Sequence, residues 1–297
     1  MNTSFIMNTS LGHLSSIQRQ QLETVEKIIV QAIHPEKIIL FGVYGTGSDG
    51  IPFNDPVLAE RFPPGLKAYD LLVVTREGDR RSDYELQDII ENRCRDAAPV
   101  TVLVHDIGYV NKRIEEGHYF FTMVRKEAIL IYDAGRTGLA TPVVPDLARI
   151  RMIAQRDFDR WRKQARAFFR SAEFNVDQGE WKIAVFLLHQ AAEHIYQAIL
   201  LAFMGYKPTT HNLDKLRRYT NRFSIELACL FPRDSAEEDR LFRLLISGYV
   251  DARYKEDFEI TGQEVALLTE RIRRLLEIAE SVCRNRLLSL EKQVAGS

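Results

Sequence analysis

The sequence predicts an α+β protein with two domains, in which a mixed α/β domain precedes an all-α helical bundle. The chain has 297 residues, about twice a common domain length. Short apolar runs typical of strands are confined to the first half, whereas the second half repeats apolar residues at helical spacing. The composition, with 45% hydrophobic and 27% charged residues, is that of an ordinary folded protein.

The first domain is expected over residues 15–134, after a flexible tail at residues 1–14. A first helix is predicted to begin at Ser15, which has capping-box spacing to Gln18, and to end before Pro35. Apolar runs predict four strands, at residues 37–43, 69–75, 100–105 and 128–132. The segments between them are predicted to be a long Gly- and Pro-rich surface loop and two helices, at residues 44–66, 82–95 and 107–116.

The second domain is expected over residues 147–297, after a linker of small, turn-forming residues at 135–146. Five helices are predicted there: one ending at Gly179, then 180–204, a short one from Asn212, then 235–254, and one opened by Thr261 and Glu264 that runs almost to the end. Their lengths and short connections are typical of a helical bundle. Four aromatic residues are assigned to its core: Trp161, Phe168, Phe169 and Trp181.

The charges exclude a strong global electrostatic field. Forty Lys and Arg face 41 Asp and Glu, so the net charge is −1 and binding to nucleic acid or a membrane would have to be local. Residues 1–146 carry 15 basic and 20 acidic residues, a net −5, which leaves +4 for residues 147–297. This mild asymmetry is compatible with a phosphate-bearing ligand on the second domain, but also with an ordinary solvated helix surface. There is no DNA-specific signal.

The cysteine pattern and the termini favour a cytoplasmic protein. Cys94, Cys229 and Cys283 lie far apart with no CxxC pair, which argues against a disulfide framework or a zinc cluster. The N-terminus has no basic region before an apolar block, and no run reaches the ~18 apolar residues of a membrane helix. We therefore expect no membrane association.

Two motifs in the first half, LFGVYGTGSDG and KAYDLLVVT, carry a resemblance to a known family. They resemble the minimal nucleotidyltransferase fold, in which a strand ends in a Gly-Ser turn and the next strand bears two carboxylates one residue apart. The resemblance implies that Gly42 and Val43 lie at the nucleotide phosphates and that Asp70 is a catalytic carboxylate and metal ligand. It also implies Mg²⁺ bound with a nucleoside triphosphate, because alternate carboxylates on one strand face can share divalent ions.

The chain departs from this family at most catalytic positions. Val43 replaces the serine, Ala68 replaces one carboxylate, and the third carboxylate falls at or near Thr101. His105 and Asp106 could supply a ligand if the strand register differed. Asp70 is therefore interpreted as a remnant of the site, the alternative being a strand-end carboxylate that caps backbone amides. One carboxylate holds hydrated magnesium weakly, so transfer activity is expected to be lost.

Three motifs of the second half carry another resemblance: HQAAE at 189–193, THNL at 210–213 and ARY at 252–254. In these motifs the second half resembles the HEPN family of nucleotide- and RNA-associated helical domains. Some HEPN domains are ribonucleases with an Arg followed four to six residues later by His, and the second half has no such pair. Arg113 and His118 have that spacing but lie in the first half, where we treat it as coincidence.

Five residues of the second half are candidates for a phosphate or nucleotide pocket: His189, Lys207, His211, Arg253 and Lys255. A guanidinium and helix-start amides are suited to hold an anion. The alternative is structural, with His189 pairing with Glu193 one helical turn away and Arg253 anchoring an acidic neighbour.

Together these patterns predict a prokaryotic-type fusion of a degenerate nucleotidyltransferase-like domain with a HEPN bundle. The expected function is nucleotide or RNA binding in a regulatory role, in a homodimer. Two alternatives stay open. One is an active nucleotidyltransferase that moves a nucleoside monophosphate to a small molecule or protein, and the other is a toxin–antitoxin-type module. The sequence leaves open whether the protein is an enzyme.

Overall fold

The computed structural model describes residues 6–44, 68–233 and 235–295. The chain divides into two compact units, Met1–Asp146 and Leu147–Ser297, which are treated separately below. The predicted surface loop at 44–66 lies outside the described residues except for Tyr44, which ends a strand.

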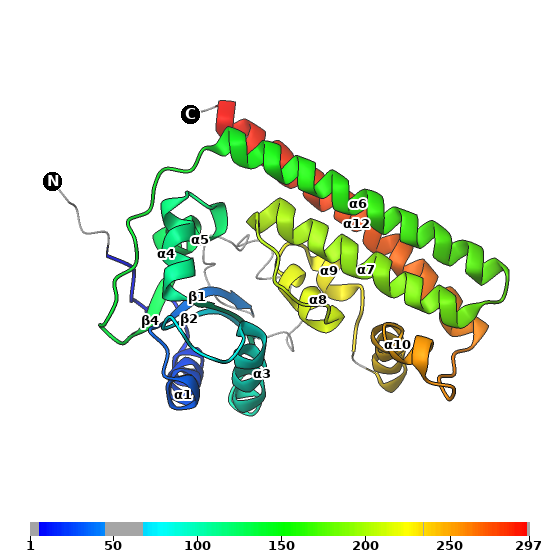
Figure 1. The fold of residues 1–297 in the computed structure, drawn as a ribbon, viewed down its shortest axis with the longest axis horizontal. Helices are drawn as coiled ribbons and strands as arrows, with labels where there is room; N and C mark the ends of the chain where they lie inside the picture. The colour runs from blue at the N-terminus through cyan, green and yellow to red at the C-terminus, as the bar shows by residue number, and fades with distance from the viewer. Residues whose placement is uncertain (1–5, 45–67, 234, 296–297) are drawn as a thin grey trace. The chain divides into compact units, whose positions relative to one another are not determined.

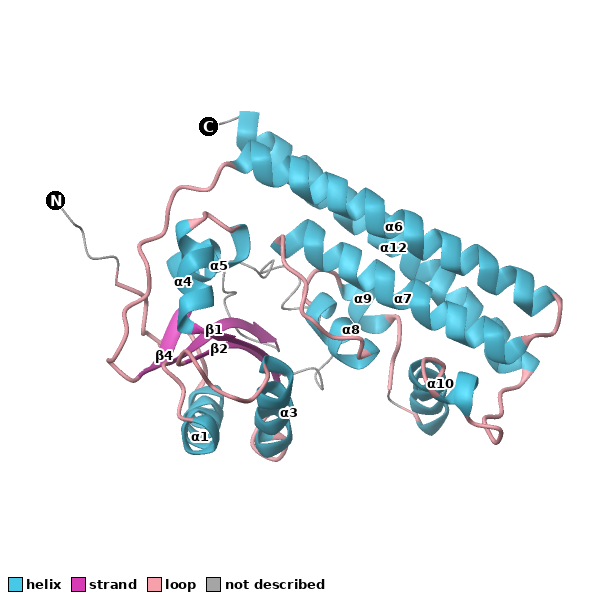
Figure 2. Cartoon of the chain, viewed as in Figure 1, coloured by secondary structure: helices cyan, strands magenta, loops and turns pink. Residues whose placement is uncertain are grey.

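A four-stranded mixed sheet forms the centre of the first unit (Figures 1 and 2). Its strands are β1 (Lys37–Tyr44), β2 (Ala68–Thr75), β3 (Val100–Asp106) and β4 (Ile129–Asp133), in the order β3-β2-β1-β4. β1 pairs antiparallel with β2 and β4, and β2 pairs parallel with β3. The four predicted strands and the mixed α/β class of this unit are confirmed.

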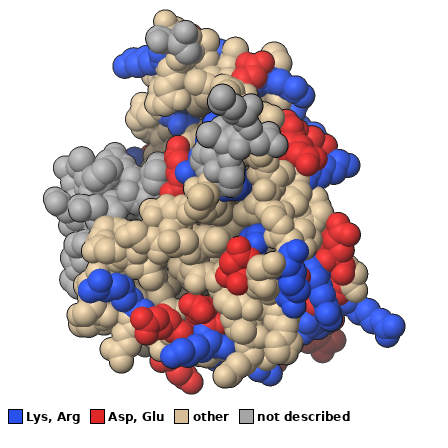
Figure 3. Space-filling view, turned by 90° about the vertical axis from the view of Figure 1, so that its left-hand side faces the viewer, with Lys and Arg blue, Asp and Glu red and all other residues tan. Residues whose placement is uncertain are grey.

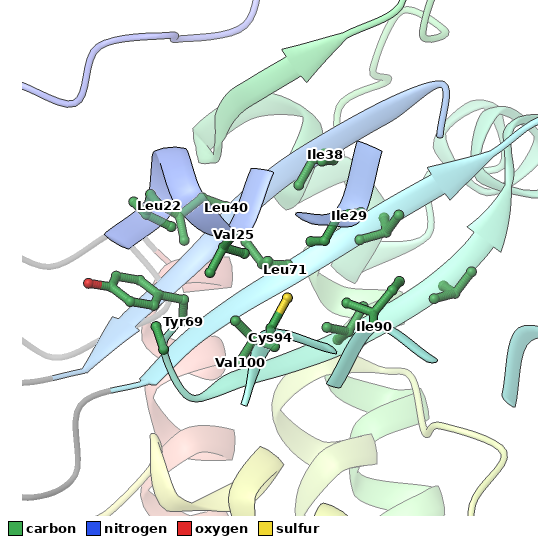
Figure 4. Packing of buried hydrophobic residues seen from close by; sticks show 14 of the residues in the cluster. Leu22, Val25, Ile29, Ile38, Leu40, Tyr69, Leu71, Ile90, Cys94 and Val100 are labelled. Atoms are coloured by element: carbon green, nitrogen blue, oxygen red, sulfur yellow. The ribbon is translucent and has the colours of Figure 1, made fainter. Parts of the chain in front are cut away.

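Helices cover both faces of this sheet (Figure 1). The helices are α1 (Ser16–Ile33) and α3 (Asp83–Cys94) on one face, and α4 (Ile107–Glu115) and α5 (Tyr119–Glu127) on the other. Between α1, α3 and the sheet lies a core of aliphatic side chains, shown in Figure 4. Tyr69 enters this core from β2, and its hydroxyl donates to Gln21 Oε1 at 2.7 Å.

Local sequence signals set the ends of the first helices. Ser15 and Gln18 form the predicted capping box of α1, and Ser82 and Glu85 form another at α3. Such a cap satisfies amide groups that have no partner within the helix. Residues 6–14, expected within a flexible tail, instead pack on the unit. Met7 and Leu14 are buried there, and the backbone N–H of Leu130 donates to the carbonyl of Asn8 at 2.8 Å.

The second unit is entirely helical, as predicted. Its helices are α6 (Leu147–Asp177), α7 (Trp181–Met204), α8 (Leu213–Asn221), α9 (Ile225–Cys229), α10 (Ala236–Ser247), α11 (Asp251–Tyr254) and α12 (Gly262–Ala295). The long helices α6, α7 and α12 pack along one another (Figure 1). Phe169 belongs to the core, but Trp181, expected there, has 41% of its surface exposed.

The helix predicted over residues 235–254 is interrupted after Ser247. Gly248 ends α10 against α7, where an added Cβ would lie 2.5 Å from Cγ1 of Val185. The turn that follows holds Tyr249 before α11 begins. The break therefore places an aromatic side chain beside α7.

None of the helices in the described part of the chain combines the length and hydrophobicity needed to cross a bilayer. Basic and acidic side chains alternate with other residues over the face shown in Figure 3. That face agrees with the near-zero net charge, because neither sign dominates it.

Candidate functional site

In the first unit the structure brings together two of the predicted residues, Gly42 and Asp70. They are cross-strand partners on β1 and β2, next to a bulge at Phe41. The Asp70 side chain is fully buried and lies over Gly42, since an added Cβ at Gly42 would come within 2.4 Å of Asp70 Oδ2. Glycine at this position therefore leaves space for the carboxylate.

Val43 does not join them. Its side chain belongs to the aliphatic core on the α1 and α3 face of the sheet, opposite Tyr69. Successive residues of a strand point to opposite faces, so Val43 points away from the face that carries Asp70. The expectation that Val43 contacts a nucleotide is thus not supported by its position.

The strand register places Thr101 directly beside Asp70 in the parallel pairing of β2 and β3. The residue beside Asp70 on β3 is therefore a threonine and not a carboxylate. His105 and Asp106 lie at the other end of β3. The first has its Nδ1 3.0 Å from Asp83 Oδ2, and the second caps α4 by accepting from the amide of Tyr109 at 2.8 Å.

The described residues offer no complete metal site. They include no group of three His, Cys, Asp or Glu side chains that could hold an ion. Magnesium requires near-octahedral oxygen coordination, and Asp70 alone does not meet that requirement. We therefore assign no step to Mg²⁺ on these residues. Arg113 and His118, which have the ribonuclease-like spacing, make other contacts. Arg113 pairs with Glu116 at 2.8 Å, and the ring centroid of His118 lies 5.4 Å from that of Phe121.

In the second unit three of the five candidates gather around the ring of Tyr249. The rings of His189 and His211 stack on it, with centroids 5.1 and 6.0 Å away, and the guanidinium carbon of Arg253 lies 4.8 Å from its centroid. These residues come from α7, from the loop before α8 and from α11. We call His189, Glu193, His211, Tyr249 and Arg253 the Tyr249 cluster.

Glu193 is the buried centre of the Tyr249 cluster. Its Oε1 accepts from Nδ1 of His211 at 2.8 Å and from Nε2 of Gln197 at 3.2 Å. The predicted pair of Glu193 with His189 is looser, with 3.8 Å between Oε2 and Nε2. Glu193 therefore orients His211 so that the second ring nitrogen, Nε2, faces away from the carboxylate. The His211 side chain is 68% exposed, so this nitrogen is available to a ligand.

His189 lies beneath this surface and is almost completely buried. Its Nδ1 donates to the carbonyl of Leu245 at 3.0 Å. Burial lowers the pKa of His189 because it disfavours the charged form, while Leu245 and Glu193 raise it and the charges of His211 and Arg253 lower it further. The neutral imidazole of His189 therefore packs against the ring of Tyr249 and does not serve as a cationic ligand for phosphate.

Arg253 is exposed but held in place. Its guanidinium carbon lies 4.8–4.9 Å from the ring centroids of Phe186, Tyr249 and Tyr254, and Nε donates to the Tyr249 carbonyl at 2.6 Å. No carboxylate in the described part of the chain pairs with it. The structural alternative, in which Arg253 anchors an acidic neighbour, is therefore not what the structure shows.

Lys207 and Lys255 do not belong to the Tyr249 cluster. Lys207 places its ammonium nitrogen 5.0 Å from the ring centroid of Trp161, and Lys255 pairs with Asp251 at 3.0 Å on α11. Of the cluster members, sequence reasoning missed Tyr249 and assigned Glu193 only to His189. A carboxylate on a helix four residues after His predicts the local pair, but the contact with His211 depends on tertiary packing.

Comparison with known proteins identifies the second unit. Residues 158–284 match the family model of the HEPN domain, so this unit contains a HEPN domain that includes the whole Tyr249 cluster. Among solved structures, the chain matches a nucleotidyltransferase-like protein from Exiguobacterium sibiricum 255-15. The match has 12% identity and a TM-score of 0.27, and it covers 94% of this chain and 80% of that chain. No curated protein matches the chain.

Proposed function

We propose that the protein binds a nucleotide or an RNA through the Tyr249 cluster of its HEPN domain, and that this binding serves a regulatory role. The observation that carries the proposal is the contact of His211 and Arg253, both exposed, with one half-buried tyrosine ring. Both side chains can donate charge-assisted hydrogen bonds to phosphate, which are about twice as strong as neutral ones.

The first unit supports a binding role better than a catalytic one. Asp70 has Thr101 beside it in the sheet where a third carboxylate would be required, and Val43 faces the core. Two-metal phosphoryl chemistry needs oxygen ligands that bridge both ions. The nucleotidyltransferase-like resemblance of this unit therefore fits a protein in which transfer chemistry has been lost.

Binding can be tested by isothermal titration with AMP, ATP, GTP and a short single-stranded RNA. We expect heat of binding for the native protein and a reduction in affinity of at least about tenfold for His211→Ala and Arg253→Ala. Arg274→Ala is the matched control, because Arg274 is another exposed arginine but already pairs with Glu277 at 2.9 Å. Absence of heat with all four ligands, or equal binding by every variant, would reject the proposal.

An active nucleotidyltransferase is a second candidate, which the close fit of Asp70 over Gly42 favours, because the site's glycine and one carboxylate remain together. Transfer of label from NTP in the presence of Mg²⁺, abolished in Asp70→Asn, would establish it. Homodimer formation and a toxin–antitoxin-type partnership are suggested by the family resemblance alone, and sedimentation analysis would test the first.

A further inference from the structure

The Tyr249 cluster has a donor arrangement that distinguishes between two kinds of phosphate. We infer that it binds a terminal phosphate, meaning a phosphomonoester, in preference to the phosphodiester of a nucleic-acid backbone. The inference rests on the proposed function, since it concerns the same site. Its support comes from the donors that the site leaves open, taken one side chain at a time.

Arg253 leaves one end of its guanidinium open. Nε is occupied by the carbonyl of Tyr249 at 2.6 Å, and the three aromatic rings lie close to the guanidinium carbon. No described residue accepts a hydrogen bond from Nη1 or Nη2 of Arg253. The open donors therefore form a fork, the geometry that holds two oxygens of one phosphate at once.

His211 adds one donor more. Its Nδ1 is held by Glu193 at 2.8 Å, so Nε2 is the nitrogen that can contact a ligand. The cation of a protonated His211 donates from Nε2 to a single oxygen. Both side chains contact one ring, that of Tyr249, with the His211 centroid 6.0 Å and the Arg253 guanidinium carbon 4.8 Å from its centroid.

Counting oxygens then separates the two ligand classes. A phosphomonoester has three non-bridging oxygens and a charge of about −1.5 to −2 near neutral pH. Two oxygens can occupy the Arg253 fork while the third accepts from His211. A phosphodiester has two non-bridging oxygens and one negative charge, so once the fork uses both, His211 has to share an oxygen that already accepts from Arg253.

Other charges at this surface do not remove the preference. Asp251 is paired with Lys255 at 3.0 Å, which offsets its charge. Glu193 is buried and its Oε1 already accepts two hydrogen bonds. The solvent-facing groups of the cluster are therefore the guanidinium of Arg253 and the imidazole of His211, and with a proton on both imidazole nitrogens their two charges would match those of a dianion.

Isothermal titration at pH 6, where a large share of exposed histidine side chains is protonated, tests the inference. The first pair of ligands is AMP and its phosphate methyl ester, in which one phosphate oxygen carries a methyl group and the phosphate is therefore a diester. We expect AMP to bind about tenfold more tightly. The second pair is a short RNA with a 5′-phosphate and the same RNA with a 5′-hydroxyl. Comparison of the two pairs shows whether the phosphate comes from a mononucleotide or from an RNA end.

Variants give a signature that loss of folding cannot produce. His211→Gln should weaken AMP binding about tenfold but leave binding of the methyl ester unchanged, whereas Arg253→Lys should weaken both ligands. Arg274→Ala should change neither, and circular dichroism verifies that each variant is folded. If monoesters and diesters bind equally well and both depend on Arg253, the preference is refuted while the proposed function stands. If no ligand binds, both are refuted.

Discussion

At the scale of single residues, Glu193 shows where sequence reasoning succeeds and where it stops. Helical spacing predicted that Glu193 lies beside His189. Its shorter contact, however, is with His211, at 2.8 Å, whereas its distance to His189 is 3.8 Å. The first relation follows from helix geometry alone. The second depends on how the loop before α8 returns to α7, which no local pattern encodes. Lys207 was drawn away from the cluster by a tertiary contact with Trp161, whereas Lys255 pairs locally with Asp251 on α11.

The three cysteines provide a prediction at this scale. Cys229 is exposed, whereas Cys94 and Cys283 are buried. Burial raises the pKa of the Cys94 thiol to about 11 and raises that of Cys283 as well, so both stay protonated at pH 8. Because the thiolate is the reactive species, a disulfide reagent such as DTNB should modify one thiol per native chain rapidly.

Denaturant serves as the control for this measurement, since unfolding should release the other two thiols and bring the total to three. Serine substitution of Cys229 should remove the rapid phase. Rapid modification of all three cysteines in the native protein would contradict the burial of Cys94 and Cys283.

At the scale of elements, most helices were predicted, among them the nine-residue α4 and α8, but two short helices were missed. The capping residues of α1 and α12 are legible in the sequence, and each forms the expected hydrogen bonds. The short helices α5 and α9, with nine and five residues, were missed. Isolated helices of that length are marginal in water, so their formation depends on packing that local periodicity does not report.

The break between α10 and α11 is testable through Gly248. A methyl group there would lie 2.5 Å from Val185 Cγ1 and 3.1 Å from two backbone oxygens. Overpacking of this kind typically costs about 1–3 kcal/mol. We therefore expect Gly248→Ala to lower the free energy of unfolding by that amount in urea denaturation. Gly138→Ala is the control, because no atom lies within 4 Å of its added Cβ. Equal stability of the two variants would show that α10 is not closely packed there.

At the scale of the whole molecule, the fold class could be predicted because the two units have different periodicities. Strand-like apolar runs produced the sheet of the first unit, and long helical repeats produced the HEPN bundle of the second. The site was harder to predict, because its members come from α7, the loop before α8, the turn after α10 and α11. The net charge of −1 has a further consequence, since no extended field of the molecule assists an anionic ligand.

The salt dependence of binding therefore measures how local the site is. For single-stranded nucleic acid, the slope of log affinity against log salt is about −0.7 for each phosphate neutralised. The cluster offers two solvent-facing groups that can carry positive charge, Arg253 and His211, which together neutralise no more than about two phosphate charges. For a short 5′-phosphorylated RNA titrated at pH 6, we expect a slope of about −1.4.

Fluorescence anisotropy between about 50 and 200 mM salt gives this slope. Arg253→Ala should make it shallower by about 0.7, since one cation is removed, whereas Arg274→Ala should leave it unchanged. A slope steeper than about −4 would require about six or more neutralised phosphates and hence an extended basic surface. That result would place RNA recognition outside the Tyr249 cluster, and the predicted local character of the site would be wrong.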